Sequence, residues 1–418
     1  MDKFIIQGPV KINGTVEVSK AKNACLPILA GVLLSAKPIT LRKVPKLRDI
    51  NTMKKILEVM GVKITIEGDD WTFDASNITS TEAPYELVKT MRASICVLGP
   101  LLARFNKGKV SLPGGCAIGT RPIDIHLANL EKMGANIKIE AGYVNADTSK
   151  LKGVHLPLNF PSVGATENLM MAAVLAEGET VIENAALEPE VSDLANFLIS
   201  MGAKITGVDT QTLHITGVKE LHGTDYTIIG DRIEAGTFIC GALMTGGDLL
   251  VKGFNPKHLD FVIDKLKAAG AQIEVGKDFV HVKPSKMKPL KLETHPYPGF
   301  PTDLQAQFVA LMMTIEGYSL ITENIFENRY MHVPELIRLG AQIELKGSTA
   351  IITGQAPLKA APIMCTDLRA SAALVLAACC TEGKTEIQRV YHIDRGYERI
   401  DQKLVDLGVP LERRNDGN

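Results

Sequence analysis

The segment KMGANIKI, residues 132–139, contains the pattern that decides the fold: a helix-like stretch ends at a glycine, and alternating apolar and polar residues follow. The pattern occurs six times, 68 to 73 residues apart, at Gly61, Gly134, Gly202, Gly270, Gly340 and Gly408. Glycine tolerates the left-handed conformation that ends many helices, and alternation is typical of a half-buried strand. Each glycine is therefore expected to close a helix and precede a strand within a repeated unit.

A second helical stretch, rich in small and apolar residues, precedes each of these glycines. The six stretches are 21–35, 92–103, 165–176, 234–244, 304–315 and 367–380. They are apolar nearly all round, as helices buried on every side are. Six units divide into two groups of three, and 418 residues fit two domains. The predicted class is α/β, with helices inside each domain and sheets outside.

The register of the repeat sets the expected domain boundary near Gly230, after the third unit. One domain is expected at 22–229, and the other at 1–21 together with 230–418. Strand-like segments at 4–6 and 16–18 have no unit before them, and the last unit has lost its closing hairpin after Arg414. These segments are expected to pair with the last unit.

Composition excludes several classes of protein. Lys and Arg number 46 and Asp and Glu 47, a net charge of -1 that does not fit a nucleic-acid binder. The apolar stretch 24–36 is interrupted by Pro27 and is too short to span a bilayer, and the N-terminus has no signal-peptide pattern, so a cytoplasmic protein is expected. The chain has seven cysteines, an odd number with no Cys-x-x-Cys spacing, which argues against a disulfide framework and a zinc cluster. No two histidines are four residues apart, which argues against a metal site on a helix.

The most unusual local sequence is PGGCAIGTRP, residues 113–122. Its glycines and prolines predict a loop, and Arg121 nearby could lower the pKa of the Cys116 thiol, which would make Cys116 an acid or a nucleophile. A turn with an incidental cysteine explains the segment equally well. The other six cysteines lie in or beside apolar helical stretches and are expected in the core.

Basic residues recur at related places in the repeat. Four lie beside the starts of the buried helices and three ahead of the second helices: Lys22, Arg92, Arg232 and Arg369, then Arg121, Arg329 and Arg395. Any one of them could be an ordinary solvated side chain. As a set they predict a site for phosphate and carboxylate groups, which arginine binds with two parallel hydrogen bonds.

Two aspartates open buried helices and allow two interpretations. Asp303, in FPTDLQ, and Asp367, in TDLRAS, could each cap a helix N-terminus. In an anion site, either could instead accept a proton from a substrate hydroxyl.

The chain resembles the UDP-N-acetylglucosamine enolpyruvyl transferase family along its whole length. The resemblance is carried by AKNACLPILA, MRASICVLGPLLAR, PGGCAIGTRPIDIH, SVGATENLMMAA, DRIEAGTF, GFPTDLQAQ, IFENRYMHVPEL, TDLRASAALVLAA and HIDRGYERI. It implies two inside-out α/β barrel domains, each of three βαβαββ units, with the active site in the cleft between them. Lys20 departs from the pattern, since many members have glycine there.

The resemblance also implies roles for individual residues. Phosphoenolpyruvate would be bound by Lys22, Asn23, Arg121, Arg329, Arg369 and Arg395. UDP-N-acetylglucosamine would contact Arg92, Arg121, Pro122, Ile123, Asp124, Ile125, Ser162, Val163, Gly164, Asp303 and Ile325. The implied catalytic residues are Cys116, Asp303, Lys22, Arg395 and Asp367. Cys116 would donate a proton and could form a covalent adduct with phosphoenolpyruvate.

The implied reaction transfers an enolpyruvyl group to the sugar 3'-hydroxyl through a tetrahedral ketal and releases phosphate, as the first committed step of peptidoglycan synthesis. The expected enzyme is a monomer that needs no cofactor or metal. Two alternatives remain: transfer to shikimate 3-phosphate, and a non-catalytic regulatory homologue.

Overall fold

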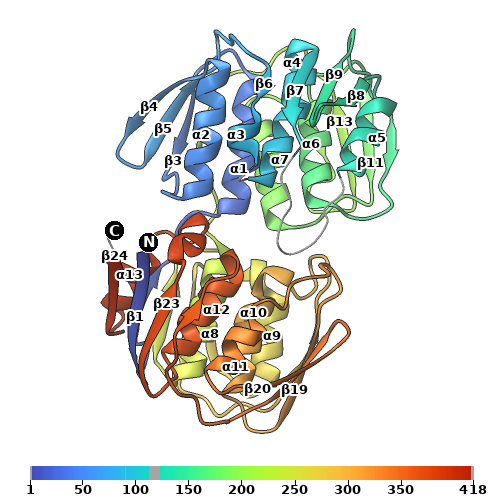
Figure 1. The fold of residues 1–418 in the computed structure, drawn as a ribbon. Helices are drawn as coiled ribbons and strands as arrows, with labels where there is room; N and C mark the ends of the chain where they lie inside the picture. The colour runs from blue at the N-terminus through green and yellow to red at the C-terminus, as the bar shows by residue number, and fades with distance from the viewer. Residues whose placement is uncertain (1, 90, 113–122, 416–418) are drawn as a thin grey trace. The chain divides into compact units, whose positions relative to one another are not determined.

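The computed structural model describes residues 2–89, 91–112 and 123–415, which form two compact units (Figure 1). The first unit contains residues 20–112 and 123–229, and the second contains 2–19 and 230–415. Lys20 and Ala21 thus belong to the first unit, although the sequence pattern assigned them to the other domain. A backbone hydrogen bond explains this, because the Ala21 N–H donates to the Ile229 carbonyl at 2.8 Å.

The first unit surrounds three buried helical segments with sheets. The buried segments are α1 (Lys22–Gly31) with η1 (Val32–Leu34), η2 (Arg92–Val97) with α4 (Leu98–Phe105), and α6 (Val163–Ala173). The other helices are α2 (Arg48–Met60), α3 (Tyr85–Val88), α5 (Asp124–Lys132) and α7 (Pro189–Ser200). The three sheets have the orders β14-β3-β5-β4, β6-β7-β9-β8 and β10-β11-β13-β12.

The strands of these sheets are short. They are β3 (Ile39–Arg42), β4 (Lys63–Glu67), β5 (Asp70–Asp74), β6 (Glu82–Ala83), β7 (Lys107–Ser111), β8 (Asn136–Glu140), β9 (Tyr143–Asp147), β10 (His155–Pro157), β11 (Glu179–Glu183), β12 (Lys204–Thr206), β13 (Thr212–Thr216) and β14 (Asp225–Thr227).

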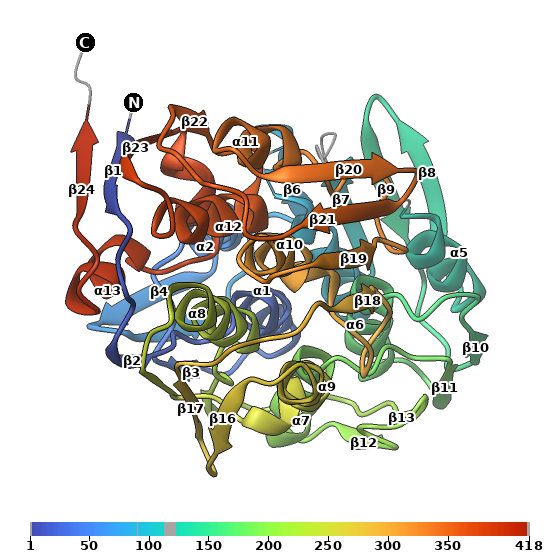
Figure 2. The same ribbon diagram turned by 90° about the horizontal axis from the view of Figure 1, so that it is seen from below.

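The second unit repeats the plan. Its buried segments are α8 (Arg232–Thr245), η4 (Thr302–Leu304) with α10 (Gln305–Met313), and α12 (Leu368–Ala378). Its outer helices are η3 (Pro256–Leu259) with α9 (Asp260–Ala268), α11 (Val333–Arg338), and η5 (Val390–Arg395) with α13 (Ile400–Asp406). Figure 2 shows α8, α10 and α12 with the strands of this unit around them.

The sheets of the second unit have the orders β16-β17-β15-β2, β18-β19-β21-β20 and β22-β23-β1-β24. Their strands are β1 (Asp2–Gly8), β2 (Gly14–Glu17), β15 (Leu249–Lys252), β16 (Gln272–Val275), β17 (Phe279–Lys283), β18 (Lys291–Glu293), β19 (Tyr318–Thr322), β20 (Gln342–Lys346), β21 (Thr349–Thr353), β22 (Ile363–Met364), β23 (Gly383–Gln388) and β24 (Leu411–Asn415). Each of the six sheets contains one parallel and two antiparallel pairs, which confirms the predicted βαβαββ repeat.

The two N-terminal strands complete two different repeats. As expected, β1 joins the sheet of the sixth repeat, where Phe4 pairs with Ile387 on one side and with Arg413 on the other. The expectation for 16–18 was wrong, because β2 pairs in parallel with β15 of the fourth repeat. The fourth repeat has no first strand of its own, and β2 takes that place in its sheet.

All six glycines adopt the left-handed conformation predicted for them, with φ between 89° and 103°. Two buried stretches are not single α-helices: 21–35 ends in the 3-10 helix η1, and 92–103 is the 3-10 helix η2 followed by α4. Pro100 explains the change in 92–103, since its missing N–H cannot bond to Cys96 as a continuous α-helix would require.

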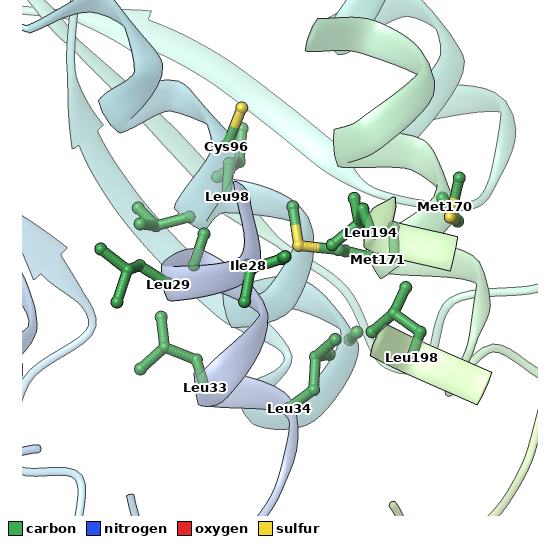
Figure 3. Packing of buried hydrophobic residues seen from close by; sticks show 14 of the residues in the cluster. Ile28, Leu29, Leu33, Leu34, Cys96, Leu98, Met170, Met171, Leu194 and Leu198 are labelled. Atoms are coloured by element: carbon green, nitrogen blue, oxygen red, sulfur yellow. The ribbon is translucent and has the colours of Figure 1, made fainter. Parts of the chain in front are cut away.

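Each unit has its own hydrophobic core, formed by side chains of the buried helices and of the strands that cover them. Figure 3 shows part of the core of the first unit, where Ile28 of the first repeat lies near Met171 and Leu194 of the third. Because the helices are buried on nearly all sides, most of their acidic and basic residues lie near their ends, although Glu167 is buried in the second turn of α6.

The glycine positions predict a graded loss of stability. Gly340→Ala and Gly408→Ala both put a side chain at positive φ, 99° and 89°, but a Cβ at 340 would lie 2.7 Å from the Pro357 carbonyl oxygen, whereas 408 has open space. Gly408→Ala should cost about 1–2 kcal/mol of unfolding free energy, and Gly340→Ala more. Urea unfolding of both variants measures the difference, and equal losses would contradict the role of the close contact.

Candidate active site

The predicted basic residues do lie where the buried helices begin. In the first unit, Lys22 is the first residue of α1 and Arg92 the first of η2. In the second unit, Arg232 opens α8 and Arg369 is the second residue of α12. A helix start also carries a partial positive charge, although Asp231 and Asp367 already accept backbone N–H bonds at the starts of α8 and α12.

Three predicted residues of the second unit form one ion-pair cluster. The Asp303 carboxylate accepts a hydrogen bond from Arg329 Nη2 at 2.8 Å and bonds from Arg369 Nε and Nη2 at 3.3 and 3.1 Å. The arginine side chains are only 5% and 3% exposed, whereas that of Asp303 is 25% exposed. Two buried guanidinium groups therefore hold one partly exposed carboxylate in a fixed orientation.

The structure separates the two aspartates that the sequence left ambiguous. Asp367 is a helix cap, because its Oδ1 accepts bonds from the N–H groups of Arg369 and Ala370 at 2.9 and 3.0 Å. Asp303 caps no helix, since it lies inside the 3-10 turn η4, which begins after Pro301. The capping interpretation is therefore wrong for Asp303 and right for Asp367.

A buried polar group supports Arg369 from behind, and the sequence analysis missed it. The Arg369 guanidinium lies over the Tyr397 ring at 5.3 Å, and the Tyr397 hydroxyl bonds to Thr237 and Gln307 at 2.9 and 3.0 Å. Tyr397 lies two residues after Arg395 in the segment HIDRGYERI, which was selected from the sequence only for its arginine. Arg395 itself is half-buried at the end of η5.

His332 is fully buried in the same unit, and neither ring nitrogen has a hydrogen-bond partner among the described residues. Burial lowers the pKa of His332 to about 4; the charge of Arg329 acts in the same direction and that of Asp367 opposes it. The imidazole is therefore neutral at pH 7.

In the first unit, Lys22 pairs with a residue that the sequence analysis did not select. Lys22 Nζ lies 3.4 Å from Asp49 Oδ2, and both side chains are largely buried. Asp49 is in the first turn of α2, and Asn23 follows Lys22 in α1. The pair fixes the ammonium group at the start of α1.

Six of the residues predicted to contact the nucleotide sugar lie on two adjoining helices of the first unit. Ser162 caps α6, with its Oγ accepting from the Ala165 N–H at 3.3 Å, and Val163 and Gly164 follow. Ile123, Asp124 and Ile125 form the start of α5. A Cβ on Gly164 would lie 3.3 Å from the His126 ring, so glycine allows α5 and α6 to approach here.

A buried asparagine joins these helices to the segment that carries Arg92. Asn168 Oδ1 accepts from the Gly99 N–H at 2.7 Å, and its Nδ2 lies 3.3 Å from the Ile95 carbonyl and 3.1 Å from His126 Nδ1. Asn168 was not predicted, although its place in GATENL, inside an apolar helix, is the signal that could have marked it.

Three predicted residues, Cys116, Arg121 and Pro122, lie outside the described residues. The other six cysteines are free thiols, five buried and Cys380 partly so, as expected. Burial raises their pKa values, to about 12 for Cys365 and Cys380.

The part of the chain that the structure describes contains neither a metal-binding cluster nor a membrane-spanning helix. No group of three or more His, Cys, Asp or Glu side chains is arranged to hold a metal ion there. Within the same residues, no helix combines the length and apolar character needed to cross a membrane.

Comparisons with known proteins agree with this geometry. Residues 6–404 match the sequence model of the family described as EPSP synthase (3-phosphoshikimate 1-carboxyvinyltransferase). The UDP-N-acetylglucosamine 1-carboxyvinyltransferase of Enterobacter cloacae is 53% identical over 99% of both chains, and that of Acinetobacter baylyi is 52% identical over 99% of this chain and all of the relative. The chain belongs to the enolpyruvyl transferase family, among the UDP-N-acetylglucosamine 1-carboxyvinyltransferases. The resemblance inferred from the motifs is thereby confirmed.

Solved structures of enolpyruvyl transferases share the fold. The enolpyruvyl transferase NikO of Streptomyces tendae superposes with a TM-score of 0.90 at 24% identity, covering 100% of this chain and 99% of NikO. An EPSP synthase of Acinetobacter baumannii gives 0.77 at 17% identity, covering 99% and 100%. At these identities the likeness concerns the fold alone, and it confirms the predicted two-domain α/β architecture.

The neutral state of His332 predicts a pH dependence of stability. Its pKa is about 4 in the folded protein, below the usual 6.5, so between these values the unfolded chain binds one more proton. Its contribution to stability is complete above pH 6.5 and is lost as the pH falls toward 4, at about 1.4 kcal/mol per pH unit.

His332→Leu should remove this dependence and, because no described hydrogen bond is lost, should keep the protein folded at pH 7.5. Urea unfolding at pH 7.5, 6 and 5 compares the slopes of variant and wild type. Identical slopes would show that His332 is not neutral in the folded protein.

Proposed function

We propose that this enzyme transfers the enolpyruvyl group of phosphoenolpyruvate to the 3'-hydroxyl of UDP-N-acetylglucosamine and releases phosphate, the first committed step of peptidoglycan synthesis. Support comes from full-length relatives of that name at 52–53% identity. The geometric observation that carries the proposal is Asp303, a carboxylate held between two buried arginines with its own side chain partly exposed.

The exchange of ion-pair partners gives Asp303 its role. Without substrate, Arg369 donates to the Asp303 carboxylate. In the proposal, the carboxylate of phosphoenolpyruvate takes over the Arg369 donors, with Arg395 as a second ligand, and Asp303 becomes able to accept the proton of the sugar 3'-hydroxyl.

The reaction then proceeds in two steps. The sugar oxygen attacks C2 of phosphoenolpyruvate while C3 gains a proton from the Cys116 thiol, which gives the tetrahedral ketal. Loss of a C3 proton and of phosphate restores the double bond as an enolpyruvyl ether. Lys22, Arg121 and Arg395 are proposed to neutralise the phosphate as it leaves, with Asn23 and Arg329 beside it.

The remaining predicted residues are assigned to the nucleotide sugar. These are Arg92, Arg121 to Ile125, Ser162 to Gly164, and Ile325. Asp367 acts through its cap on the helix of Arg369. The proposal requires the groups of both units to reach the same substrates, as expected for a cleft between domains.

The proposal includes a monomer in the cytoplasm. Phosphoenolpyruvate and a nucleotide sugar are multiply charged and do not cross a bilayer unaided, so an enzyme that consumes both is expected where both are made. Sedimentation velocity tests the monomer directly.

Phosphate release tests the substrate. Release should occur with phosphoenolpyruvate and UDP-N-acetylglucosamine together, and not with shikimate 3-phosphate as acceptor. Shikimate 3-phosphate is the rival because the matched family is described by that reaction. Release with it would favour the rival, and no release with either acceptor would favour a non-catalytic homologue.

Asp303→Asn should lower kcat about 10²- to 10⁴-fold, because an amide cannot accept the hydroxyl proton. Asp264→Asn, at an exposed position on α9 in the same unit, is the matched control and should leave kcat unchanged. Steady-state phosphate release measures both. Equal rates for the two variants would remove Asp303 from the mechanism.

The epoxide fosfomycin should alkylate Cys116 and stop turnover. The other thiols are poor competitors, since burial raises even the pKa of the partly exposed Cys380 to about 12 and leaves little thiolate at pH 7.5. Mass spectrometry of tryptic peptides identifies the modified cysteine, with Cys116→Ser as the control. Modification at another cysteine would contradict the assignment.

A further inference from the structure

Glu323 is a buried carboxylate that none of the roles above uses. It follows strand β19 directly and is only 3% exposed. Its Oε1 accepts bonds from the Thr294 hydroxyl at 2.9 Å and from the N–H groups of Ile325 and Phe326 at 2.8 and 3.1 Å. Its Oε2 accepts from the Thr302 hydroxyl at 2.8 Å.

These bonds connect Glu323 to three predicted site residues. Ile325 is held through its own backbone N–H. Asp303 is the neighbour of Thr302 in η4, and Arg329 Nη1 donates to the Thr302 hydroxyl oxygen at 3.2 Å. One carboxylate therefore anchors the turn of Asp303, the loop of Ile325 and one donor of Arg329.

The polarity of this relay is fixed by chemistry. An ionised carboxylate only accepts hydrogen bonds, so the Thr302 hydroxyl must donate its single proton to Glu323. The lone pairs of the hydroxyl are then directed away from Glu323, and the Arg329 guanidinium can donate to them. Glu323 thus determines which way the threonine points.

Arg329 is held on a second side by the same loop. Its guanidinium lies 5.2 Å from the centre of the Phe326 ring, and the Phe326 N–H is one of the groups bonded to Glu323. Of the described partners of Arg329, Thr302 and Phe326 are both positioned by Glu323, and the third is Asp303 itself.

We propose that Glu323 is a positioning residue of the active site, which acts through Thr302 and the 324–326 loop to orient Arg329 and Asp303. The inference rests on the proposed function, because Asp303 must face a substrate hydroxyl for its orientation to affect turnover. Both oxygens of Glu323 accept hydrogen bonds from other protein groups. Glu323 therefore acts on the reaction only through the residues that it positions.

The test uses single-atom changes along the relay. Thr302→Val removes the hydroxyl and keeps the shape, and Thr302→Ser restores the hydroxyl. Glu323→Gln keeps one acceptor oxygen but can present an N–H donor to Thr302, which would turn the hydroxyl proton toward Arg329. Thr322→Val is the matched control, because Thr322 is next to Glu323 but bonds to Thr349 at 2.8 Å, outside the relay.

Thr302→Val and Glu323→Gln should each lower kcat about 10- to 100-fold, with less than about threefold change in the KM for UDP-N-acetylglucosamine. Their double variant should be no worse than either single variant, because both changes break one relay. Thr302→Ser and Thr322→Val should keep wild-type kcat. A purely structural role predicts losses that add and that follow the fall in Tm, and this result would overturn the proposal.

Crystal structures of the Thr302→Val and Glu323→Gln variants provide a readout that does not depend on activity. The Arg329 guanidinium should shift away from Asp303 in both, lengthening the 2.8 Å contact. If the wild-type enzyme releases no phosphate with UDP-N-acetylglucosamine, the proposed function fails, while these structures still test the relay. An unmoved Arg329 in both variants would overturn the proposal.

Discussion

The burial of six helices on all sides is the constraint on which the rest of the structure depends. Each helix is apolar around its whole circumference and must be covered by a sheet, so each unit has helices inside and strands outside. Few polar side chains can then lie along the helices, and those that do, such as Asn168 and Thr237, are hydrogen-bonded to other protein groups. The charged groups assigned to the proposed site accordingly lie at helix starts and in the loops that follow strands, as Lys22, Arg369 and Glu323 do.

Charges buried at helix ends need partners even when no substrate is bound. Lys22 has Asp49, and Arg329 and Arg369 have Asp303. Breaking a buried pair without replacement costs several kcal/mol, so an anionic substrate must replace the partner that it displaces. The internal ion pairs therefore keep the basic groups in position and favour ligands that carry their own negative charge.

The sequence predicted most of the fold because its signals are local. A glycine at positive φ and an all-round apolar helix are both visible within about ten residues, and all six glycines conform. The partner of β2 could not be predicted in this way, because pairing with β15 joins residues more than 200 positions apart. The sequence did select Asp303 and Arg369, which the structure brings together in one ion-pair cluster. Glu323, Tyr397 and Asn168 were missed because their importance depends on hydrogen bonds between distant segments.

The starts of the three buried helices in the second unit show how a repeated position can acquire a different role. Asp231 and Asp367 both cap their helices, each accepting two backbone N–H bonds. Asp303, in the middle repeat, does not, because its helix begins with a 3-10 turn after Pro301 and its carboxylate bonds to arginine side chains instead.

An aspartate engaged with backbone N–H groups contributes to stability and cannot turn toward a ligand without uncapping its helix. An aspartate held only by side chains can exchange those partners for a substrate. In the proposed mechanism, the absence of a cap in the fifth repeat leaves the Asp303 carboxylate able to act on a substrate. Its orientation must then be supplied from elsewhere, by the buried arginines and by the carboxylate that orients Thr302.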